Sequence, residues 1–258
     1  MLGAYIGDIV GSIYEFNNIK TKDFPLFQKT CTFTDDSVLT CAVAMVYKWR
    51  WETTPHEINR EVLSKKLVAA LHIMGQTYPH AGYGGRFYRW LKNRETEPYN
   101  SFGNGAAMRC SSAGWFAESL EQAMELGEIS AAVTHNHPEG IKGARITAGC
   151  IYLARQKESK KAIRDFAAQY YNLNFTLDEI RPTYDFDVTC QGTVPQAIVA
   201  FLESVDFEDA LRNAISLGGD SDTLAAITGS IAEPFYGIPQ SIVEQALPFI
   251  SAKLREVL

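Results

Sequence analysis

Two short segments, far apart in the chain, each crowd two aspartates and a threonine together. They are Thr34-Asp35-Asp36 and Asp220-Ser221-Asp222-Thr223. Carboxylates this close raise one another's pKa and cost stability, and a bound cation removes that cost. Carboxylate and hydroxyl oxygens without cysteine suit hard ions such as Mg²⁺, Mn²⁺ or Ca²⁺. The two segments together therefore predict a metal centre in which the aspartates bracket a pair of ions.

Both segments also have simpler interpretations. Each precedes an apolar helical pattern, so Thr34 is a candidate N-cap and the acids are favoured by the helix dipole; for the first segment alone, capping is the stronger interpretation. Capping needs one carboxylate per helix, however, and leaves the second unexplained. Residues 220–224 also match the DxDxT motif of haloacid-dehalogenase-like phosphatases. That motif follows a hydrophobic strand early in its domain, whereas this one follows an amphipathic helix and two glycines late in the chain.

The rest of the sequence predicts the elements that position these residues. Apolar residues recur at intervals of three and four, which is typical of helices. Helices are expected at residues 35–49, 56–72, 120–134, 141–155, 160–171, 194–204, 207–217, 222–235 and 241–257. Only residues 180–189 look extended, as a short hairpin arm or an ordered loop. We expect an all-α fold: a compact orthogonal multi-helix bundle, a single domain over residues 1–258, with the metal site between loops at helix starts.

Composition narrows the class of protein. The chain has 258 residues, 46% of them hydrophobic, which is enough for a substantial core. A net charge of -6 without a basic stretch argues against a nucleic-acid partner. The five cysteines are scattered and form no CxxC pair, so we expect reduced thiols and a cytoplasmic protein. No apolar stretch is long enough to cross a membrane, and the apolar run that contains Asp8 lacks the basic residues of a signal peptide.

Two glycine-rich segments are candidates for binding phosphate. Residues 101–109 read SFGNGAAMR, and such a loop exposes backbone amides to a phosphate without charged side chains. Residues 80–86, HAGYGGR, form a second segment of this kind. Taken alone, an ordinary turn at the start of a helix explains a GxG pattern better. On an acidic protein, these loops are still the places where a phosphate-bearing ligand would find donors.

Five segments, in chain order, resemble the signature segments of the ADP-ribosylglycohydrolase family. They are GAYIGDIVGSIYEF, FTDDSVLTCAVA, SFGNGAAMRCSSAGWFA, THNHPEGIKGA and GGDSDTLAAITGSIAEPFYG, and the resemblance extends from Gly3 to about Pro239. It implies a compact all-α hydrolase with a dinuclear Mg²⁺ or Mn²⁺ centre. Such an enzyme cleaves the bond between ADP-ribose and a modified acceptor, and the family includes arginine-directed and serine-directed members.

The resemblance also assigns roles to individual residues. The implied metal ligands are Thr34, Asp35, Asp36, Asp220, Asp222 and Thr223, and the implied catalytic residues are Glu15, Asp36 and Asp222. Glu15 is the acid beside the metals, which bridges them or organises the attacking water. The implied substrate-binding residues are Gly84, Gly103, Asn104, Gly105, Ala106, Met108 and His135. His135 is placed near the ribose and is preferred over His137 because it follows Thr134 in the shared TH pair; from the residues alone, either is an ordinary helix-end histidine.

These roles imply hydrolysis at the anomeric carbon of the distal ribose, through an oxocarbenium-like transition state, with release of ADP-ribose. Arginine is the first choice of acceptor because the THNHP segment looks closer to the arginine-directed members. Tyr184, Phe186 and Tyr236 are available to stack on adenine, and the sequence does not choose among them. The expected partners are an ADP-ribosylated protein or small molecule, with nucleic acid only in ADP-ribosylated form.

Two other functions remain open at this point. One is another dinuclear-metal hydrolase, such as a nucleotide phosphohydrolase, which release of free phosphate would distinguish. The other is a non-catalytic ADP-ribose-binding protein, against which the intact acidic segments argue, because a protein that has lost its activity usually loses at least one such residue. A monomer is the default expectation for a compact hydrolase.

Overall fold

Helices form the regular secondary structure of residues 1–54 and 57–258, the part of the chain that this computed structural model describes. They are α1 (Leu2–Gly11), α2 (Asp35–Thr53), α3 (Arg60–Thr77), α4 (Gly85–Lys92), α5 (Gly105–Met108), α6 (Ser111–Trp115), α7 (Leu120–Ala132), α8 (Pro138–Arg155), α9 (Lys160–Ala167), α10 (Leu177–Ile180), α11 (Cys190–Glu203), α12 (Phe207–Ile215), α13 (Ser221–Tyr236), α14 (Gln240–Ala246) and α15 (Ala252–Arg255). The predicted all-α class is confirmed.

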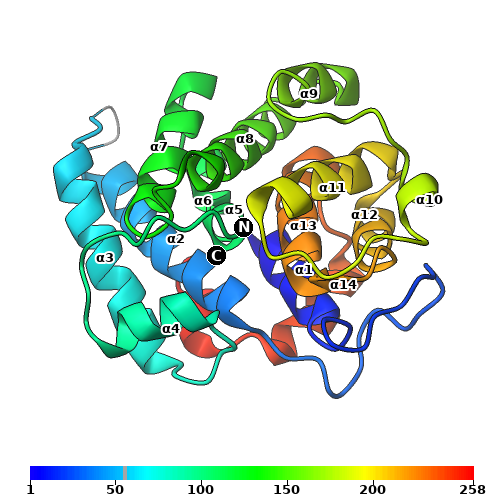
Figure 1. Cartoon of the computed structure of the whole chain (residues 1–258), viewed down its shortest axis with the longest axis horizontal. Coiled ribbons are helices and arrows are strands. Elements are labelled where there is room, and N and C mark those ends of the chain that lie inside the picture. Colours follow the sequence, from blue (N-terminus) through cyan, green and yellow to red (C-terminus); the bar gives the residue numbers. More distant parts are fainter. Residues whose placement is uncertain (55–56) are drawn as a thin grey trace.

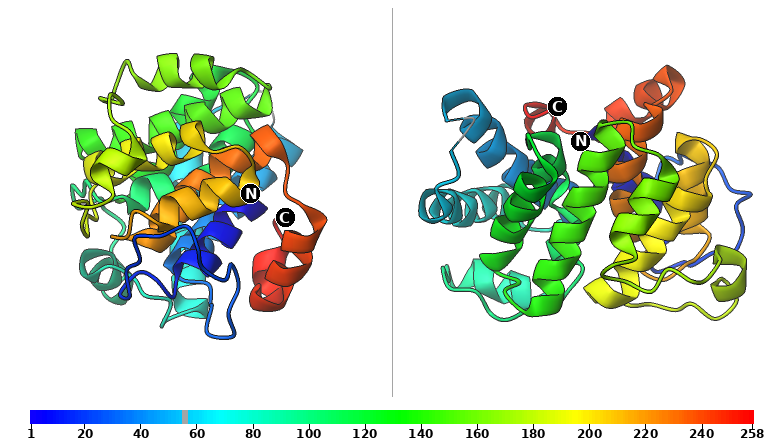
Figure 2. Two further views of the ribbon diagram at one scale, coloured as in Figure 1. Left: turned by 90° about the vertical axis from the view of Figure 1, so that its right-hand side faces the viewer. Right: turned by 90° about the horizontal axis from the view of Figure 1, so that it is seen from above.

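The centre of the fold is the pair α1 and α13, which lie side by side in all views (Figures 1 and 2) although they come from opposite ends of the chain. Glycines on α1 allow this close approach. A Cβ atom at Gly7 would lie 2.1 Å from the carbonyl oxygen of Ala225, and one at Gly11 would lie 2.4 Å from Cα of Asp222. The end of α1 is thereby held against the start of α13, and Glu15, in the turn that follows α1, lies near Asp220 and Asp222.

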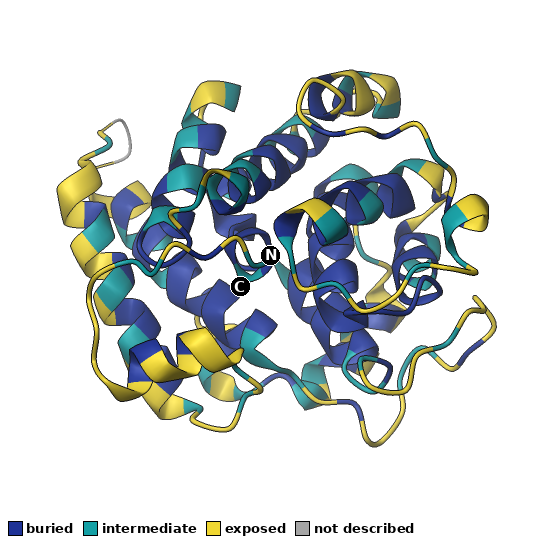
Figure 3. Ribbon diagram, in the orientation of Figure 1, coloured by how far each residue is buried: buried dark blue, intermediate teal, exposed yellow. Residues whose placement is uncertain are grey.

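The other helices cover this central pair. On one side α11 and α12 pack against α13, and on the other α2 contacts α1, with α3 outside it. α8 lies against both α7 and α13 and so connects the two sides. Figure 3 shows that α13 and α1 are buried along most of their length, whereas α4 and α9 expose one face. The buried apolar residues form one continuous cluster through these layers.

Two of the predicted elements need correction. The helix expected at residues 241–257 is wrong: α14 ends at Ala246, a 3-10 turn follows at Leu247–Phe249, and α15 begins at Ala252. Pro248 explains the break, because proline has no backbone N–H to donate inside a helix. The helix expected at residues 56–72 is observed as α3, but its predicted start at residue 56 lies outside the described residues.

Two further features were not foreseen or were left open by the sequence. α1 is a helix that the pattern did not predict. Residues 181–189 form an ordered loop rather than a hairpin arm; within the described chain, their extended pairing is limited to one antiparallel bridge between Thr189 and Gly103. A search of the described helices finds none with the length and apolar character needed to span a membrane.

Candidate functional site

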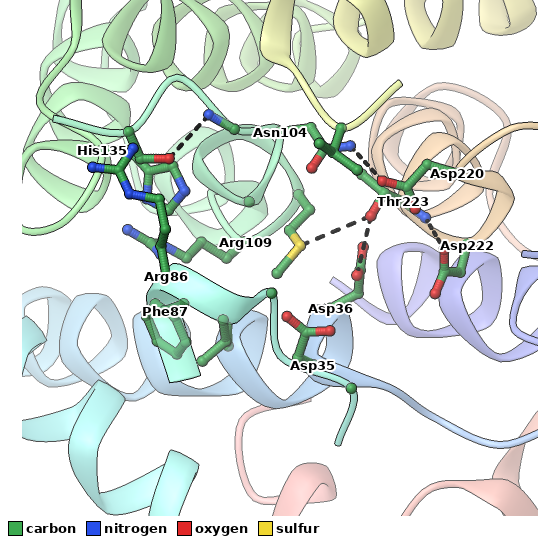
Figure 4. Close-up of a pocket in the computed structure, with 18 of the residues that line it drawn as sticks. Asp35, Asp36, Arg86, Phe87, Asn104, Arg109, His135, Asp220, Asp222 and Thr223 are labelled. Carbon is green, nitrogen blue, oxygen red and sulfur yellow. Dashed lines mark hydrogen bonds between the residues drawn. The ribbon is translucent and has the colours of Figure 1, made fainter. Parts of the chain in front are cut away.

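A cavity of about 400 Å³ is lined by residues of α2, α4, α5 and α13 and by the loops between the helices. The acidic residues lie at one end of this cavity, and Arg86, Arg109 and His135 lie at the other (Figure 4). The predicted site residues that line it are Glu15, Asp35, Asp36, Gly84, Gly103, Asn104, Gly105, Met108, His135, Asp220, Asp222 and Thr223. Of the predicted residues, Thr34 and Ala106 are outside the lining. The structure thus brings residues from both ends of the chain to one place.

The first acidic segment is held at the start of α2 by hydrogen bonds. The Thr34 hydroxyl accepts from the backbone nitrogen of Asp36 at 3.3 Å, so the capping interpretation of Thr34 is confirmed. The same hydroxyl donates to Asp8 on α1 at 2.7 Å, and the backbone nitrogen of Ser37 donates to Asp8 at 3.0 Å. Capping therefore uses the threonine and leaves the carboxylates of Asp35 and Asp36 free to face the cavity.

The second acidic segment follows two glycines with a left-handed backbone, Gly218 and Gly219, both with φ of 70°. Asp220 stands at the N-cap position of α13, but its side chain accepts no capping hydrogen bond, so the capping interpretation is wrong for this residue. Its carboxylate instead accepts a hydrogen bond from the Asn104 side chain at 2.7 Å. The Thr223 hydroxyl donates to Asp36 at 3.2 Å and joins the two segments directly.

The donor set fits divalent cations. Carboxylate oxygens of Glu15, Asp220 and Asp222 all lie within 4.8 Å of one another. One oxygen of Asp36, Oδ1, is buried and has no hydrogen-bond partner. In residues 1–54 and 57–258, no lysine or arginine forms an ion pair with any of these acids. A buried group of carboxylates without a cationic partner is the arrangement that a hard metal ion stabilises.

The electrostatics of the acidic end agree with this. Burial, followed by repulsion from Asp220 and Asp8, raises the pKa of Glu15 to about 7. Burial, followed by repulsion from Asp8 and Asp220, raises the pKa of Asp35 to about 8. Burial raises the pKa of Asp8 to about 6, although hydrogen bonds from Ser37 and Thr34 lower it. Without a cation, Glu15 and Asp35 are wholly or partly protonated at neutral pH, and a bound cation would favour their ionised forms.

The glycine loop forms the wall between the two ends. A Cβ atom at Gly103 would lie 3.4 Å from Nε2 of His135, and one at Gly105 would lie 3.3 Å from the same atom. The loop is fixed to the 181–189 loop by the bridge to Thr189, and the backbone nitrogen of Asn104 donates to the carbonyl oxygen of Val188 at 2.8 Å. The space between this loop and His135 is therefore narrow. A ligand fits there only because Gly103 and Gly105 have no side chains.

The structure distinguishes the residues that the sequence left as alternatives. His135 lines the cavity, whereas His137 caps α8 by accepting from the backbone nitrogen of Glu139 at 3.1 Å. Of the three candidate aromatics, Phe186 lines the cavity. Tyr184 donates to the carbonyl oxygen of Gly192, and the hydroxyl of Tyr236 contacts Ser204; neither of these tyrosines lines the cavity.

Sequence reasoning missed three residues of this site. Asp8 accepts a hydrogen bond from the Thr34 hydroxyl. In the sequence its only signal is that it is a single acid inside an apolar run. Arg109 is fully buried and lines the cavity, and in the sequence it is simply the last residue of the glycine segment. Thr134 contacts both Arg109 and His135, at 2.6 and 2.7 Å. Its position beside His135 in the sequence gave no sign of the contact with Arg109.

Comparisons with known proteins point in one direction. A family model for ADP-ribosylglycohydrolase matches residues 1–254. ADP-ribosylhydrolase ARH3 of Homo sapiens is 25% identical over 322 residues, covering 93% of this chain and 85% of that protein. ADP-ribosylarginine hydrolase Tri1 of Pseudomonas putida (strain GB-1) is 24% identical over 266 residues, covering 92% and 70%.

A solved structure, described as an ADP-ribosylglycohydrolase-related protein complex, has the same fold. Its TM-score is 0.68 at 20% identity, and the match covers 100% of this chain and 96% of that one. The family model thus matches nearly the full length of the present chain, including the helices and the residues of the acidic cavity. The chain belongs to the ADP-ribosylglycohydrolase family, whose members are hydrolases that cleave glycosidic bonds to ADP-ribose.

Proposed function

We propose that this enzyme cleaves the N-glycosidic bond between ADP-ribose and a modified arginine side chain, with two Mg²⁺ or Mn²⁺ ions. The observation that carries the proposal is the polarity of the cavity. Carboxylates from α2 and α13 line one end, and Arg86, Arg109 and His135 lie at the other. A ligand with a sugar at one end and phosphates beyond it fits such a cavity. The choice of arginine is supported by the resemblance to Tri1, whose name specifies that acceptor.

The residues that would hold the ions are Thr34, Asp35, Asp36, Asp220, Asp222 and Thr223. When bound, such ions polarise the ribose oxygens and favour deprotonation of water. The chain's own contribution is to arrange these oxygens before binding. Thr34 and Asp8 fix the start of α2, and Asn104 and Thr223 fix Asp220 and Asp36. The uncharged donors among them orient the acids without neutralising their charge.

Glu15 is the residue that we assign to proton transfer. It lies in the turn that follows α1, next to the oxygens of Asp220 and Asp222, and it is only partly buried. Bound cations would favour the ionised form of this carboxyl group, which can then accept a proton from water and later return it. In the proposed step, the water oxygen bonds to the anomeric carbon, and a water proton passes to Glu15. The electron pair of the carbon–nitrogen bond leaves with the guanidine.

The other end of the cavity binds the rest of ADP-ribose in this proposal. Gly103, Gly105 and Met108 line the wall beside the ligand, and the Asn104 side chain is engaged with Asp220. Ala106 is buried behind the loop and does not line the cavity, so in this proposal it packs under the loop and does not contact the ligand. Gly84 begins the facing wall at the start of α4. The family match favours this function over both a nucleotide phosphohydrolase and a non-catalytic binding protein.

Further expectations accompany this proposal. The continuous core supports a single domain over residues 1–258. A cytoplasmic location and a monomeric state stay predictions. ADP-ribosylated proteins or small molecules remain the expected substrates, with nucleic acid expected only in ADP-ribosylated form.

The test of the proposal is release of free ADP-ribose from peptides modified on arginine or on serine. The purified protein is incubated with Mg²⁺, Mn²⁺ or EDTA, and free phosphate is followed in parallel. We expect metal-dependent release from the arginine substrate, lowered more than about 100-fold in Asp222→Asn and unchanged in Asp165→Asn, an exposed aspartate of α9. Release from serine alone would overturn the choice of acceptor. Phosphate release without ADP-ribose would overturn the reaction.

A further inference from the structure

The basic end of the cavity contains a buried arginine without an acidic partner. Arg109 is fully buried, and its Nη2 donates to the carbonyl oxygen of Ser130 at 2.8 Å and to the Thr134 hydroxyl at 2.6 Å. Its Nε and Nη1 have no hydrogen-bond partner. Among the described residues, no carboxylate forms an ion pair with it. A charge that is costly to bury thus has, in the described part of the chain, one side-chain hydrogen-bond partner, Thr134.

Thr134 connects this arginine to the cavity. It is fully buried, and its hydroxyl lies 2.7 Å from Nδ1 of His135. A guanidinium group only donates hydrogen bonds, so the Thr134 oxygen must accept from Arg109. The hydroxyl hydrogen then needs an acceptor of its own. Within residues 1–54 and 57–258, Nδ1 of His135 is the acceptor in reach of that hydroxyl.

This arrangement determines where His135 carries its hydrogen. If Nδ1 carried it, the Thr134 oxygen would face two donors, and the threonine's own hydrogen would be buried without an acceptor. A doubly protonated imidazole would have the same fault and would also place a second positive charge beside Arg109. Burial, followed by the charges of Arg109 and Arg86, accordingly holds the pKa of His135 well below its usual value. The neutral ring with hydrogen on Nε2 lets the Thr134 oxygen accept from Arg109 and lets the Thr134 hydroxyl donate to Nδ1.

Nε2 is the ring atom that faces the ligand. It lies beside the glycine loop, where Cβ atoms at Gly103 and Gly105 would come within 3.4 and 3.3 Å of it. Unlike Nδ1, it has no hydrogen-bond partner in the described part of the chain. It is therefore a donor that lies beside the glycine loop at the cavity, and Figure 4 draws His135 at the end of the cavity opposite Asp220 and Asp222.

We propose that Arg109 and Thr134 are positioning residues that fix His135 as the neutral tautomer with hydrogen on Nε2, so that this nitrogen donates to an acceptor oxygen of the bound ADP-ribose. The tautomer follows from contacts within the chain. Only the identity of the acceptor rests on the proposed function. The arrangement selects ligand atoms that accept a hydrogen bond and rejects those that donate.

The first measurement is on the free protein. Long-range ¹H–¹⁵N correlation spectra of protein labelled with ¹⁵N-histidine report the tautomer of each of the five histidines. His135→Gln identifies the signals of His135 by their loss. We expect a neutral ring with hydrogen on Nε2 at pH 7. Hydrogen on Nδ1, or a doubly protonated ring, in the parent protein would overturn the inference without any variant having to fold.

The second measurement separates the hydroxyl from the shape of the side chain. Thr134→Val keeps the shape and removes the hydroxyl, whereas Thr134→Ser keeps the hydroxyl. We expect Thr134→Val to show a mixture of both neutral tautomers and to bind ADP-ribose about tenfold more weakly. We expect Thr134→Ser to keep the parental tautomer and an affinity within about twofold. An unchanged tautomer and affinity in a folded Thr134→Val protein would contradict the positioning role.

The two proposals fail in distinguishable ways. If the proposed function is wrong, the parent protein binds no ADP-ribose, while the expected tautomer of His135 still supports the internal arrangement. If this inference is wrong, ADP-ribose still binds to the parent, but the tautomer differs or does not respond to Thr134→Val. Thermal unfolding of each variant, measured alongside, identifies any loss of affinity that comes from loss of the fold.

Discussion

Asp8 on α1 accepts hydrogen bonds from both the backbone nitrogen and the hydroxyl of Thr34, at 2.9 and 2.7 Å. The same carboxylate also accepts from the backbone nitrogen of Ser37 at 3.0 Å. One buried acid therefore fixes the first turn of α2 and, with it, the direction of Asp35 and Asp36. Because all these partners donate hydrogen bonds, the side chain at residue 8 must offer acceptor atoms and no donor.

The Asp8→Asn variant tests this arrangement. An amide of the same shape directs a donor toward at least one of the donors of Thr34 and Ser37. We expect the free energy of unfolding to fall by about 2 kcal/mol at pH 8, where Asp8 is ionised. Urea denaturation measures it, with Asp165→Asn as the exposed control. Equal stability of the two variants would show that the contacts of Asp8 are not needed.

The acidic end predicts a dependence of stability on pH. Glu15 and Asp35 have pKa values of about 7 and 8 in the folded protein, against roughly 4 in an unfolded chain. The folded state therefore binds protons more tightly, and its stability without metal should fall as the pH rises from about 4 to about 8.

Added Mg²⁺ should counteract this loss of stability at higher pH. Cations bind the ionised carboxylates, so the stabilisation by Mg²⁺ should be greater at pH 8 than at pH 6. Melting temperatures at pH 5, 6, 7 and 8, in EDTA and in Mg²⁺, measure both effects. The Asp35→Asn variant should flatten the EDTA curve. A melting temperature in EDTA that rises between pH 5 and pH 8 would contradict the prediction.

The sequence was informative where function depends on segments of neighbouring residues. Both acidic segments and the glycine loop could be identified from short strings, and all of them meet at the cavity. Asp8, Arg109 and Thr134 could not be assigned in this way, because their contacts join residues that are 25 or 26 positions apart or cross between helices. Local spacing carries no information about such pairs.

The missed and misplaced helices have physical reasons. α1 contains three glycines, which lower helix propensity, and the helix is stabilised by its fit against α13 rather than by its own sequence. Periodicity alone does not reveal such a tertiary effect. The break between α14 and α15 is different, because Pro248 is a sequence signal that ends a helix even where the apolar pattern continues.

The fit between α1 and α13 predicts a strong effect at Gly7. A methyl group there would lie 2.1 Å from the carbonyl oxygen of Ala225, which is backbone and cannot move aside. We expect Gly7→Ala to lower the free energy of unfolding by about 3 kcal/mol. Gly85→Ala is the matched control, because a Cβ atom at that residue meets nothing within 4 Å. If the two variants unfold at the same urea concentration, the close packing of α1 on α13 is not what stabilises the pair.

The two glycine loops make different predictions for ligand binding. A methyl group at Gly105 would lie 3.3 Å from Nε2 of His135, in the space that the ligand must enter, whereas one at Gly84 would meet nothing within 4 Å. Both residues line the cavity, and neither has a positive φ. We therefore expect both alanine variants to fold, with Gly105→Ala binding ADP-ribose at least about tenfold more weakly and Gly84→Ala within about threefold of the parent. Titration calorimetry with ADP-ribose measures both. If Gly84→Ala is the more damaging change, the ligand lies against the wall formed by α4, and the loop before α5 is not its main binding surface.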